Sequence, residues 1–320
     1  MNYLVSRMDL YEYTYNLVRQ IPKGFVSTYG AVAKALGDVR ASRAVGKMMN
    51  ENPHPNTMPC YKIVYSDGRI GGFALGTKEK IRRLRNDNIT VTNGEVSDFE
   101  KVFFNDFKTI YPLKICRKKQ LHLREKLCLQ DQLEENQITS VAGFDVAYST
   151  KKHDQACISC VIIDYQKKEI LEKKTLFQKT HFPYIPTYLT FRETPLIQKL
   201  YVDLDIEPSV LMFDGNGILH PYQFGLASHA GVLLEKPSIG VAKSLLCGTQ
   251  QKNDTITYDE KILGKAFYAH QQVKKPVYVS SGNMISLSTA FNIVSKLSKY
   301  KHPKPVREAH LLATNTIKAN

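Results

Sequence analysis

Residues 209–217, with the sequence SVLMFDGNG, decide the fold of the larger part of this chain. A short apolar run bounded by polar residues is typical of a strand that is buried on both faces of a sheet. The run ends at Asp214, and a loop with two glycines follows it. This stretch therefore predicts a buried strand that carries a carboxylate at its end.

The segments before this strand predict the rest of its sheet. The expected elements are, in order, a polar helix over 118–135, strands over 141–149, 156–165 and 169–177, and an amphipathic helix over 193–204. Strands that are followed by a helix and a further apolar strand are typical of an α/β sheet. We therefore expect an α/β domain in this part of the chain.

Residues 10–50 have a different pattern and predict helices, with a break at Gly37-Asp38 between two of them. After a proline-containing loop, residues 61–73 predict a β-hairpin with Asp67-Gly68 at its turn. Two short helices joined by a tight turn are the pattern of a helix-turn-helix, which can present a helix to a groove of DNA.

The two patterns meet near Tyr111-Pro112, after a stretch without regular periodicity. A length of 320 residues is sufficient for two domains with separate cores. We predict a two-domain α/β protein with an N-terminal domain over 1–90, a linker over 91–116 and a C-terminal domain over 117–320.

The charge of the chain favours a polyanionic partner. It has 44 Lys and Arg against 30 Asp and Glu, a net charge of +14, and neutralised phosphates release counterions. A basic surface without a nucleic-acid partner is the alternative. No apolar run approaches the ~18 residues of a membrane span. The six scattered cysteines are typical of free thiols in a reducing cytoplasm, so we expect a cytoplasmic protein without a membrane partner.

Cys60 lies between a proline and an aromatic residue, and a single cysteine is more often an inert buried thiol than a nucleophile. Its neighbourhood decides between the two. Three motifs occur in order around it: IPKGFVSTYG, SRAVGKMMNENPHPNTMPCYKIV and SDGRIGGFALGTKEK. Over about residues 10–90 they resemble the DNA-binding and active-site domain of the O6-alkylguanine-DNA alkyltransferases. The resemblance implies a helix-turn-helix, winged-helix-like domain.

This resemblance also implies a role for each matching residue. Cys60 would accept an alkyl group irreversibly from a guanine that is flipped out of the duplex, because its O6 atom cannot be reached inside the stack. Arg43 would fill the space that the base leaves, and Tyr29 would press on the target phosphate. Asn52 would orient the active-site loop, and the Gly71-Gly72 turn would help to close the pocket.

The sequence departs from that family beside the cysteine. Tyr61 stands where the family has a histidine that helps to form the thiolate, and a phenol with a pKa near ~10 is a poor base at neutral pH. Asp87 stands where the family has a supporting glutamate. Only a short segment precedes the first motif, as in alkyltransferase-like lesion sensors, although those replace the cysteine. A non-catalytic sensor is therefore the alternative for this half.

Two carboxylates mark the strands of the second half. Asp145 lies in the first predicted strand, and Asp214 ends a later one. Carboxylates on neighbouring strands can share a hard divalent cation, which prefers oxygen ligands. Mg²⁺ would polarise a scissile phosphate and help to generate hydroxide. Because an aspartate at a strand end is more often a turn or a cap, the surrounding motifs decide.

Those motifs extend over most of the second half. They are PYIPTYLTFRETP, VLMFDGNGILHPYQFGLASHAGVLLEKPSIGVAKSLLCG, VSSGNMISLSTAFNIV and KPVREAH. Over about residues 117–315 they resemble endonuclease V, the deoxyinosine 3′ endonuclease. The resemblance implies an RNase H-like α/β fold with Mg²⁺ as cofactor, for which Mn²⁺ can substitute.

The second resemblance implies a further set of site residues. Asp145 and Asp214 would bind the metal, while Glu193 and His310 would complete the acidic and proton-handling centre. Lys243 would stabilise charge on the phosphate near the cleavage point. Tyr184, in the sequence PYIP, would be a wedge beside the extruded hypoxanthine.

The GNG loop after Asp214 contains a departure from the second family. Asn216 stands where that family commonly has histidine, and we expect it to tune base recognition without abolishing activity. We expect Gly215 and Gly217 to let backbone amides approach the base edge. His220 and His229 are expected to be structural or to contact phosphate.

Together, the two resemblances predict a bifunctional DNA repair protein. It would transfer alkyl groups from guanine to Cys60 and nick double-stranded DNA at the second phosphodiester on the 3′ side of deoxyinosine. An endoribonuclease that acts on inosine-containing RNA is the alternative for the second half. We expect a monomer.

Overall fold

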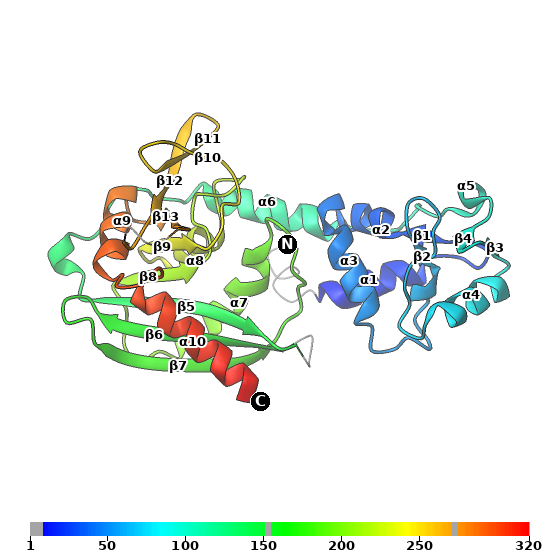
Figure 1. The fold of residues 1–320 in the computed structure, drawn as a ribbon, viewed down its shortest axis with the longest axis horizontal. Coiled ribbons are helices and arrows are strands. Elements are labelled where there is room, and N and C mark those ends of the chain that lie inside the picture. Colours follow the sequence, from blue (N-terminus) through cyan, green and yellow to red (C-terminus); the bar gives the residue numbers. More distant parts are fainter. Residues whose placement is uncertain (1–8, 151–154, 271–273, 320) are drawn as a thin grey trace. The chain divides into compact units, whose positions relative to one another are not determined.

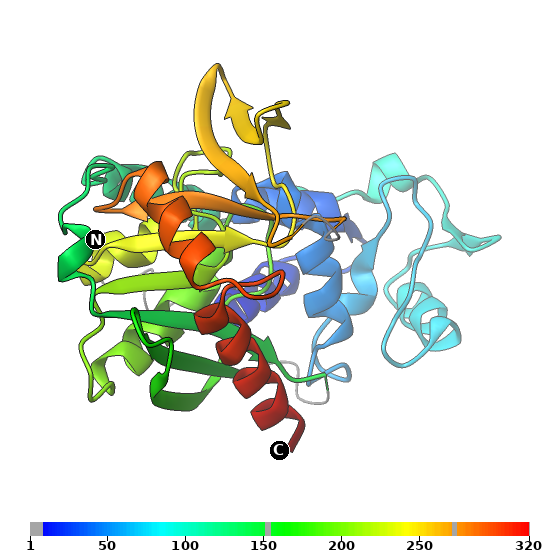
Figure 2. The ribbon, with the colours of Figure 1, turned by 60° about the vertical axis from the view of Figure 1, so that its left-hand side comes forward.

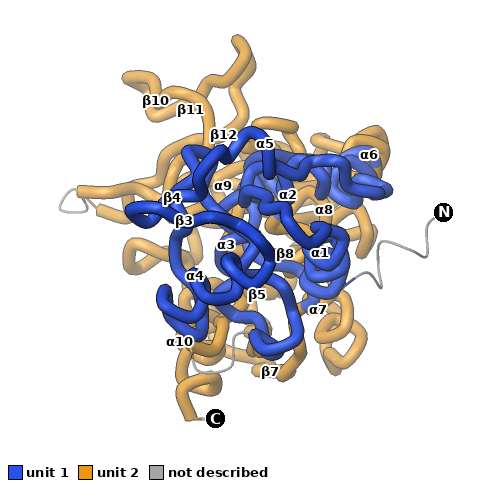
Figure 3. Tube along the Cα trace, turned by 90° about the vertical axis from the view of Figure 1, so that its right-hand side faces the viewer, with its two compact units in different colours: residues 1–118, 181–188 blue, residues 119–180, 189–320 orange. Residues whose placement is uncertain are grey.

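The computed structural model describes residues 9–150, 155–270 and 274–319. The chain divides into two compact units (Figure 3). Unit 1 contains residues 1–118 and 181–188, and unit 2 contains residues 119–180 and 189–320. The chain therefore passes from one unit to the other three times. No helix in the described residues is long and apolar enough to cross a membrane.

Unit 1 consists of short helices and two-residue strands (Figure 1). Its elements are α1 (Leu10–Arg19), β1 (Ser27–Thr28), α2 (Tyr29–Leu36), η1 (Val39–Ala41), α3 (Ser42–Asn50), η2 (Cys60–Lys62), β2 (Ile63–Val64), α4 (Thr77–Asn86), β3 (Val91–Thr92), β4 (Glu95–Val96), α5 (Phe99–Val102) and the first part of α6 (Pro112–Arg124).

Side-chain caps and one glycine explain where the helices of unit 1 begin and end. The Asp9 carboxylate accepts hydrogen bonds from the N–H groups of Tyr11 and Glu12 at the start of α1. The hydroxyl of Thr28 caps α2 in the same way. Gly37 ends α2 with a φ of 108°, a left-handed conformation that favours glycine. The break predicted at Gly37-Asp38 is thus present.

The hairpin predicted over 61–73 forms only in part. Its turn is present, since the N–H of Tyr65 donates to the carbonyl of Arg69 over 2.9 Å. The strand before it is limited to β2, which pairs with β1 in parallel. After the turn, the N–H of Ile70 donates to the carbonyl of Gly94. The second arm therefore pairs with a later segment, which the local pattern of residues could not indicate.

The segment 91–116, which the sequence analysis assigns to a linker, contains regular elements and lies in unit 1. β3 and β4 form a hairpin whose turn residues Asn93 and Gly94 have φ values of 51° and 81°. An Asn-Gly pair is favoured in such turns because both residues tolerate a positive φ. Val91 and Val96 are buried in the core of unit 1, so this segment contributes to its packing.

Unit 2 contains a large mixed sheet with helices on both faces. Its elements are the end of α6, η3 (Glu135–Gln137), β5 (Ser140–Tyr148), β6 (Gln155–Asp164), β7 (Ile170–Lys179), α7 (Leu189–Val202), β8 (Val210–Asp214), α8 (Leu226–Leu234), β9 (Ser238–Ala242), β10 (Thr249–Gln250), β11 (Thr255–Tyr258), β12 (Lys261–Phe267), β13 (Val277–Asn283), α9 (Leu287–Lys296) and α10 (Lys304–Ala319).

Two of the expected helices have different limits. The helix expected over 118–135 is α6, which begins at Pro112 and ends at Arg124. Proline is tolerated in the first turn of a helix, where its missing N–H has no partner to lose. The helix expected over 193–204 is α7, which begins four residues earlier and places Glu193 inside its first half.

The order of the strands determines which strand ends meet. Among the described residues, nine strands form the sheet, in the order β10-β11-β12-β13-β9-β8-β5-β6-β7. β5, β8 and β9 are adjacent and parallel (Figure 1), whereas their outer neighbours are antiparallel. Parallel strands end at the same edge of a sheet. The carboxyl ends of these three strands therefore lie side by side.

Both faces of this sheet are buried. On one face, side chains of β5, β8, β9 and β13 pack against α9 and α10. The ribbons of α9 and α10 are shown in Figures 1 and 2. On the other face, side chains of β5, β6 and β8 pack against α7 and α8. Such double coverage explains why β8 is apolar in sequence without alternation. The expected mixed α/β class is confirmed.

Candidate functional sites

Cys60 lies at the start of η2 and lines an open pocket of about 460 Å³ in unit 1. Tyr29 and Arg43, from α2 and α3, line the same pocket. Asn52, which is also buried, donates a hydrogen bond from its amide nitrogen to the Cys60 sulfur over 3.4 Å. Four of the residues predicted for this half are thus brought together.

The pocket also contains residues that the sequence analysis did not assign. The ring of Tyr65 lies 5.6 Å from the ring of Tyr29, and both line the pocket. Gly71 has a φ of 64°, and a methyl group there would lie 2.9 Å from the Tyr65 ring. Gly72 lines the pocket directly. The predicted Gly71-Gly72 turn therefore adjoins the pocket wall.

Tyr61 does not face the thiol as a base. Its hydroxyl donates a hydrogen bond to Asp87 over 3.0 Å, and the same carboxylate forms an ion pair with Lys62 at 2.8 Å. Burial, together with the hydrogen bond to Asp87, raises the pKa of Tyr61 to about 12. The phenol is therefore a hydrogen-bond donor at neutral pH. Lys62 is a residue of this network that the sequence analysis missed.

Burial raises the pKa of the Cys60 thiol above its ordinary value. The hydrogen bond from Asn52 and the charges of Lys80 and Arg83 act in the opposite direction but do not compensate. Lys80 is fully buried, and its ammonium donates to the carbonyls of Ile63 and Gly72. A lysine buried beneath a thiol is a second feature that the sequence pattern did not reveal.

The register of β5 and β8 brings two carboxylates together in unit 2. Phe144 pairs with Phe213 in parallel, so the next residues, Asp145 and Asp214, occupy neighbouring positions at one edge of the sheet. His310 joins them, and one ligand atom from each of these three residues lies within 4.8 Å of the others. Two carboxylates and an imidazole could hold a divalent metal ion.

His310 reaches this group because α10 lies very close to β5. A methyl group on Gly143 would lie only 2.2 Å from the backbone carbon of Pro305, so this approach requires glycine. The hydroxyl of Ser159 on β6 also donates to the carbonyl of Ala309 over 2.6 Å. With α10 fixed there, the Nδ1 of His310 lies 2.8 Å from Asp145.

The negative charges of the carboxylates in this group are only partly compensated by neighbouring positive charges and hydrogen bonds. Burial and the nearby Asp214 charge raise the pKa of Asp145, although the hydrogen bond with His310 opposes the change. Glu193 on α7 is buried and accepts a hydrogen bond from the Tyr148 hydroxyl over 2.9 Å. Burial, with the charges of Asp145 and Asp214, raises the pKa of Glu193 to about 8. The site therefore favours the approach of a cation.

Two cationic or ionisable side chains border the carboxylates. Lys243 follows β9 directly and forms an ion pair with Asp214. His302, which the sequence analysis did not consider, lies near Lys243. Burial and the charge of the Lys243 ammonium both lower the pKa of the His302 ring. Its sequence signal is weak, because it lies in a polar loop without a regular pattern.

In the GNG loop, the N–H groups of the two glycines donate hydrogen bonds to other groups of unit 2 and are not available to a ligand. The N–H of Gly215 donates to the carbonyls of Phe213 and Val241, and the N–H of Gly217 donates to the Ser280 hydroxyl over 2.9 Å. The expectation that these amides approach a base edge is therefore wrong. The side-chain oxygen of Asn216 is buried and has no hydrogen-bond partner among the described residues.

His220 and His229, which the sequence analysis also singled out, differ in their surroundings. The Nδ1 of His220 accepts a hydrogen bond from the N–H of Tyr222, so His220 helps to shape the loop before α8. His229 is buried between the rings of Phe191 and Phe224, and its Nδ1 has no hydrogen-bond partner among the described residues. Burial lowers the pKa of His229 to about 3. His229 is therefore a neutral core residue.

Tyr184, the predicted wedge, lies in the segment 181–188 that belongs to unit 1. Its side chain is 54% exposed, whereas both neighbours in the chain, Pro183 and Ile185, are buried. An exposed aromatic ring between buried neighbours is presented to solvent by a fixed backbone.

Comparison with known families assigns both parts of the chain. A family model described as endonuclease V matches residues 121–311. A second model, described as the DNA-binding domain of 6-O-methylguanine DNA methyltransferase, matches residues 9–89.

Individual relatives span nearly the whole chain. A bifunctional methyltransferase/endonuclease of Picrophilus torridus is 41% identical over 306 residues, which is 96% of either chain. A protein with the same name from Thermoplasma volcanium is 41% identical over 317 residues, 98% of this chain and 92% of the relative. Among solved structures, the catalytic domain of human endonuclease V is 28% identical with a TM-score of 0.61, and covers 66% of this chain and 98% of its own.

A second solved structure contains nucleic acid. Endonuclease V of Ciona intestinalis, in complex with a 24mer DNA containing an inosine followed by a ribo-adenosine, is 30% identical with a TM-score of 0.60. The match covers 65% of this chain and 98% of that chain.

Proposed function

The chain belongs to the endonuclease V family and, over almost its full length, to the bifunctional methyltransferase/endonucleases, and from this we propose that it repairs DNA with two separate sites. Unit 1 transfers alkyl groups from O6-alkylguanine to Cys60. Unit 2 nicks double-stranded DNA on the 3′ side of deoxyinosine. The observation that supports the second activity most strongly is the group formed by Asp145, Asp214 and His310.

The alkyl transfer is a displacement at carbon by the Cys60 sulfur. The thiol gives its proton to water, the thiolate attacks the alkyl carbon, and the bond from that carbon to O6 breaks. The restored guanine takes up a proton from water at N1 and remains part of the DNA. The pocket supports this step because Cys60 lines it together with Tyr29 and Arg43. Arg43 replaces the extruded base in the duplex, and Tyr29 contacts the target phosphate. Asn52 orients the sulfur through its hydrogen bond.

The nuclease site fits a hard divalent cation, because two carboxylates, Asp145 and Asp214, lie together, and burial and the charge of Asp214 raise the pKa of Asp145. We assign Mg²⁺ to it, with Mn²⁺ as a substitute. When bound, this ion polarises the scissile phosphate and activates water. Asp145 and Asp214 hold the ion, and His310 handles protons beside Asp145.

Three further side chains complete the proposed nuclease site. The Glu193 carboxyl is held by the Tyr148 hydroxyl; burial raises its pKa, and it lies close enough to the two aspartates for their charges to raise it further. The Lys243 ammonium, which pairs with Asp214, supplies positive charge to the phosphate. Tyr184 acts as the wedge beside the extruded hypoxanthine.

The proposed division of the chain follows the two activities. We propose an alkyltransferase domain over 1–90 with a helix-turn-helix, winged-helix-like fold and an RNase H-like domain over 117–320. Residues 91–116, assigned to a connection from the sequence, complete the core of unit 1, and residues 181–188 fold with it. We propose a monomer, since one copy of the chain carries every residue proposed for the two sites.

One pair of measurements tests both activities. The purified chain is incubated with one duplex that contains O6-methylguanine and with another that contains deoxyinosine, each with Mg²⁺ or with EDTA. We expect one methyl group on Cys60 in both conditions and a nick only with Mg²⁺. An unmodified Cys60 contradicts the first activity, and an uncut deoxyinosine duplex with Mg²⁺ contradicts the second.

The surroundings of Cys60 favour one alternative for unit 1. Its pKa is raised, and the hydroxyl of Tyr61 is bound to Asp87 rather than to the sulfur. A thiol of this kind is compatible with a lesion sensor that binds O6-alkylguanine without reaction. Tight binding of the duplex without transfer of the methyl group would support the sensor.

An alternative for unit 2 is cleavage of inosine-containing RNA. The Ciona relative was solved with an inosine followed by a ribo-adenosine, so a ribonucleotide is accommodated there. Matched duplexes that differ only in one 2′-hydroxyl after inosine separate the two substrates. Faster cleavage of the ribonucleotide would support the RNA enzyme.

A further inference from the structure

The segment 181–188 has an unusual place in the molecule. It connects β7, which ends at Lys179, with α7, which begins at Leu189, and both of these elements lie in unit 2. The segment itself belongs to unit 1 (Figure 3). It carries Tyr184, the proposed wedge of the nuclease. The part of the chain that would open the DNA at inosine is thus folded with the unit that contains Cys60.

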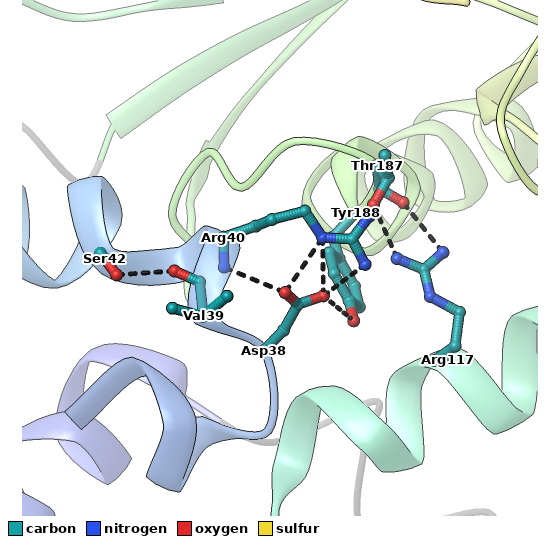
Figure 4. Close-up of polar contacts among 7 residues, drawn as sticks. All are labelled: Asp38, Val39, Arg40, Ser42, Arg117, Thr187 and Tyr188. Carbon is teal, nitrogen blue, oxygen red and sulfur yellow. Dashed lines mark hydrogen bonds and ion pairs between the residues drawn. The ribbon is translucent and has the colours of Figure 1, made fainter. Parts of the chain in front are cut away.

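One anchor of this segment is Tyr188, whose side chain is 2% exposed. Its hydroxyl donates a hydrogen bond to Asp38 over 2.9 Å (Figure 4). The Asp38 carboxylate also accepts from the guanidinium of Arg40, at 2.7 Å from the nearer nitrogen. A carboxylate held by two donors on different elements is fixed in direction, so Asp38 gives Tyr188 a single position.

A second anchor is Arg117 on α6. Its guanidinium donates to the Thr187 hydroxyl over 2.6 Å and to the Thr187 carbonyl over 3.4 Å, and lies 4.1 Å from the centre of the Tyr188 ring (Figure 4). Thr187 has a φ of 69°, which is rare for a β-branched residue. Such a conformation persists only when its surroundings fix it, and Arg117 contacts both its side chain and its backbone.

The other end of the segment is attached to α1. The carbonyl of His181 accepts a hydrogen bond from the N–H of Leu10 over 2.8 Å. The ring Nδ1 of His181 lies 2.7 Å from the carboxylate of Asp9. Tyr184 therefore lies between two points of attachment, both formed by residues of unit 1.

The attachment point at Asp38 is itself next to the proposed DNA contact of unit 1. Asp38 precedes η1 in the turn between α2 and α3. The carbonyl of Val39 in η1 accepts a hydrogen bond from the Ser42 hydroxyl over 2.6 Å (Figure 4), and Arg43 is the next residue of α3. The same turn thus lies directly before Arg43 in the chain and holds the segment with Tyr184.

We infer that Asp38 and Arg117 are positioning residues for the nuclease: they fix the segment 181–188, and so the wedge Tyr184, to the DNA-binding unit that carries Cys60. This inference rests on the proposed nuclease function. Its consequence is that unit 1 is required for the extrusion of inosine even when no alkylated base is present. The fusion of the two units then serves the nuclease chemistry as well as the search for lesions.

The test uses full-length variants that weaken the attachment and leave the metal site intact. Tyr188→Phe removes the hydrogen bond to Asp38, and Arg117→Gln removes the charged guanidinium whose two nitrogens contact Thr187. In single-turnover reactions at saturating deoxyinosine duplex, we expect the nicking rate to fall about tenfold in Arg117→Gln, because misplaced groups lose orientation. We expect a smaller fall in Tyr188→Phe and a smaller fall in Arg117→Lys than in Arg117→Gln, because lysine keeps a positive charge near the Tyr188 ring.

A spectroscopic readout separates positioning from a general loss of folding. With 2-aminopurine beside deoxyinosine, base extrusion raises the fluorescence, and we expect Arg117→Gln to reduce this rise in proportion to the nicking rate. Methyl transfer to Cys60 reports that unit 1 is folded and should be unchanged. The matched control is Asp67→Asn, which removes the partner of Arg69 in a second Asp-x-Arg ion pair of unit 1. It should change neither readout.

Hydrogen exchange of the amides in 182–188 makes the inference independent of the nuclease activity. We expect faster exchange in Arg117→Gln than in the unaltered chain and in Asp67→Asn. Unchanged exchange, or unchanged nicking and fluorescence with faster exchange, overturns the inference. If the unaltered chain does not nick deoxyinosine at all, the proposed function fails and Arg117 and Asp38 have no nuclease to position.

Discussion

The two sites differ in how far the charges of their carboxylates are compensated by neighbouring groups. In unit 1, Asp87 receives both the hydroxyl of Tyr61 and the ammonium of Lys62, so its charge is compensated within the protein. In unit 2, Asp145 and Asp214 lie side by side and the pKa of Asp145 is raised. A site with compensated charges needs only its DNA substrate, whereas crowded carboxylates need a cation. The comparison supports the proposed division between a site that reacts with DNA alone and a site that holds a metal ion.

The largest expected effect is that one substitution in each site removes one activity and leaves the other unchanged. Asp214→Asn alters a proposed metal ligand and is expected to lower nicking by about 10³-fold, since a bound metal supplies several kcal/mol of charge stabilisation. Methyl transfer should be unchanged. Cys60→Ser is expected to abolish methyl transfer and leave nicking unchanged. Both rates are measured on the same preparations by gel electrophoresis and peptide mass spectrometry.

The control for this pair is Asp164→Asn. Asp164 is a carboxylate of unit 2 whose contacts are the N–H groups of Gln166 and Lys167 in a turn. Its replacement should alter neither activity. If Asp214→Asn also suppressed methyl transfer, the two sites would not be independent and the comparison would be wrong.

A pH profile tests the thiol of unit 1. Because burial raises the pKa of Cys60, the reactive thiolate is the minor form at neutral pH and its fraction increases with pH. We expect the rate of methyl transfer to rise close to tenfold per pH unit from about pH 6.5 to 8.5. Tyr61→His should raise the rate at pH 7 and flatten the profile, because an imidazole can accept the proton.

The conservative variant Tyr61→Phe serves as its control. Since the Tyr61 phenol with a pKa of about 12 donates to Asp87 and is not a base, its removal should leave the slope of the profile unchanged. A rate that does not depend on pH, together with a large loss in Tyr61→Phe, would show that the phenol handles the proton after all.

The strand ends of unit 2 could be predicted from sequence, and the reason is physical. A strand buried on both faces leaves a clear apolar run, so the polar residue at its end, Asp214, stands out. Asp145 lies within β5, and its neighbours Phe144 and Val146 face the core with α7 and α8. The pairing of Phe144 with Phe213, which places the two aspartates together, depends on the sheet and is visible only in the structure.

Long-range contacts explain most of what the sequence did not indicate. The segment 181–188 was expected to belong with the nuclease residues around it, but Tyr188 binds Asp38, which lies 150 positions earlier. Lys80 gave no signal because a lysine in a charged helix is usually exposed, and its burial depends on the carbonyls of Ile63 and Gly72. Local patterns record neighbours in sequence, and these residues have partners elsewhere.

The close approach of α10 to β5 provides the next test. In Gly143→Ala the new methyl group would lie 2.2 Å from the backbone of Pro305, so α10 must move away from β5. We expect unit 2 to lose about 3 kcal/mol of stability, and nicking to fall because His310 no longer reaches Asp145. Methyl transfer in unit 1 should not change. Hydrogen exchange along α10 and the nicking rate measure the two effects.

Gly30→Ala is the matched control, since a methyl group there meets only the Thr28 hydroxyl, at 3.8 Å. It lies in α2, where alanine is more favourable than glycine, so unit 1 should be slightly more stable. Full nicking activity in Gly143→Ala would mean that His310 is not needed at Asp145.

The smallest expected effect concerns His229, a buried group of unit 2 without charge compensation. Its pKa is about 3 in the folded chain and near its ordinary value of 6.5 in the unfolded chain, so between these values only the unfolded chain binds a proton. Unit 2 should therefore lose stability as the pH falls below 6.5, by about 2 kcal/mol at pH 5. In His229→Gln this dependence should disappear, although the variant is less stable at pH 7 because an amide is buried without partners.

Native-state hydrogen exchange of the α8 amides at pH 5 and 7 measures both changes. If both proteins lose the same amount of stability between pH 7 and pH 5, the group that causes the loss is not His229. The carboxylates of Asp145 and Glu193 in the nuclease site cannot cause it either, because their raised pKa values favour the folded chain as the pH falls.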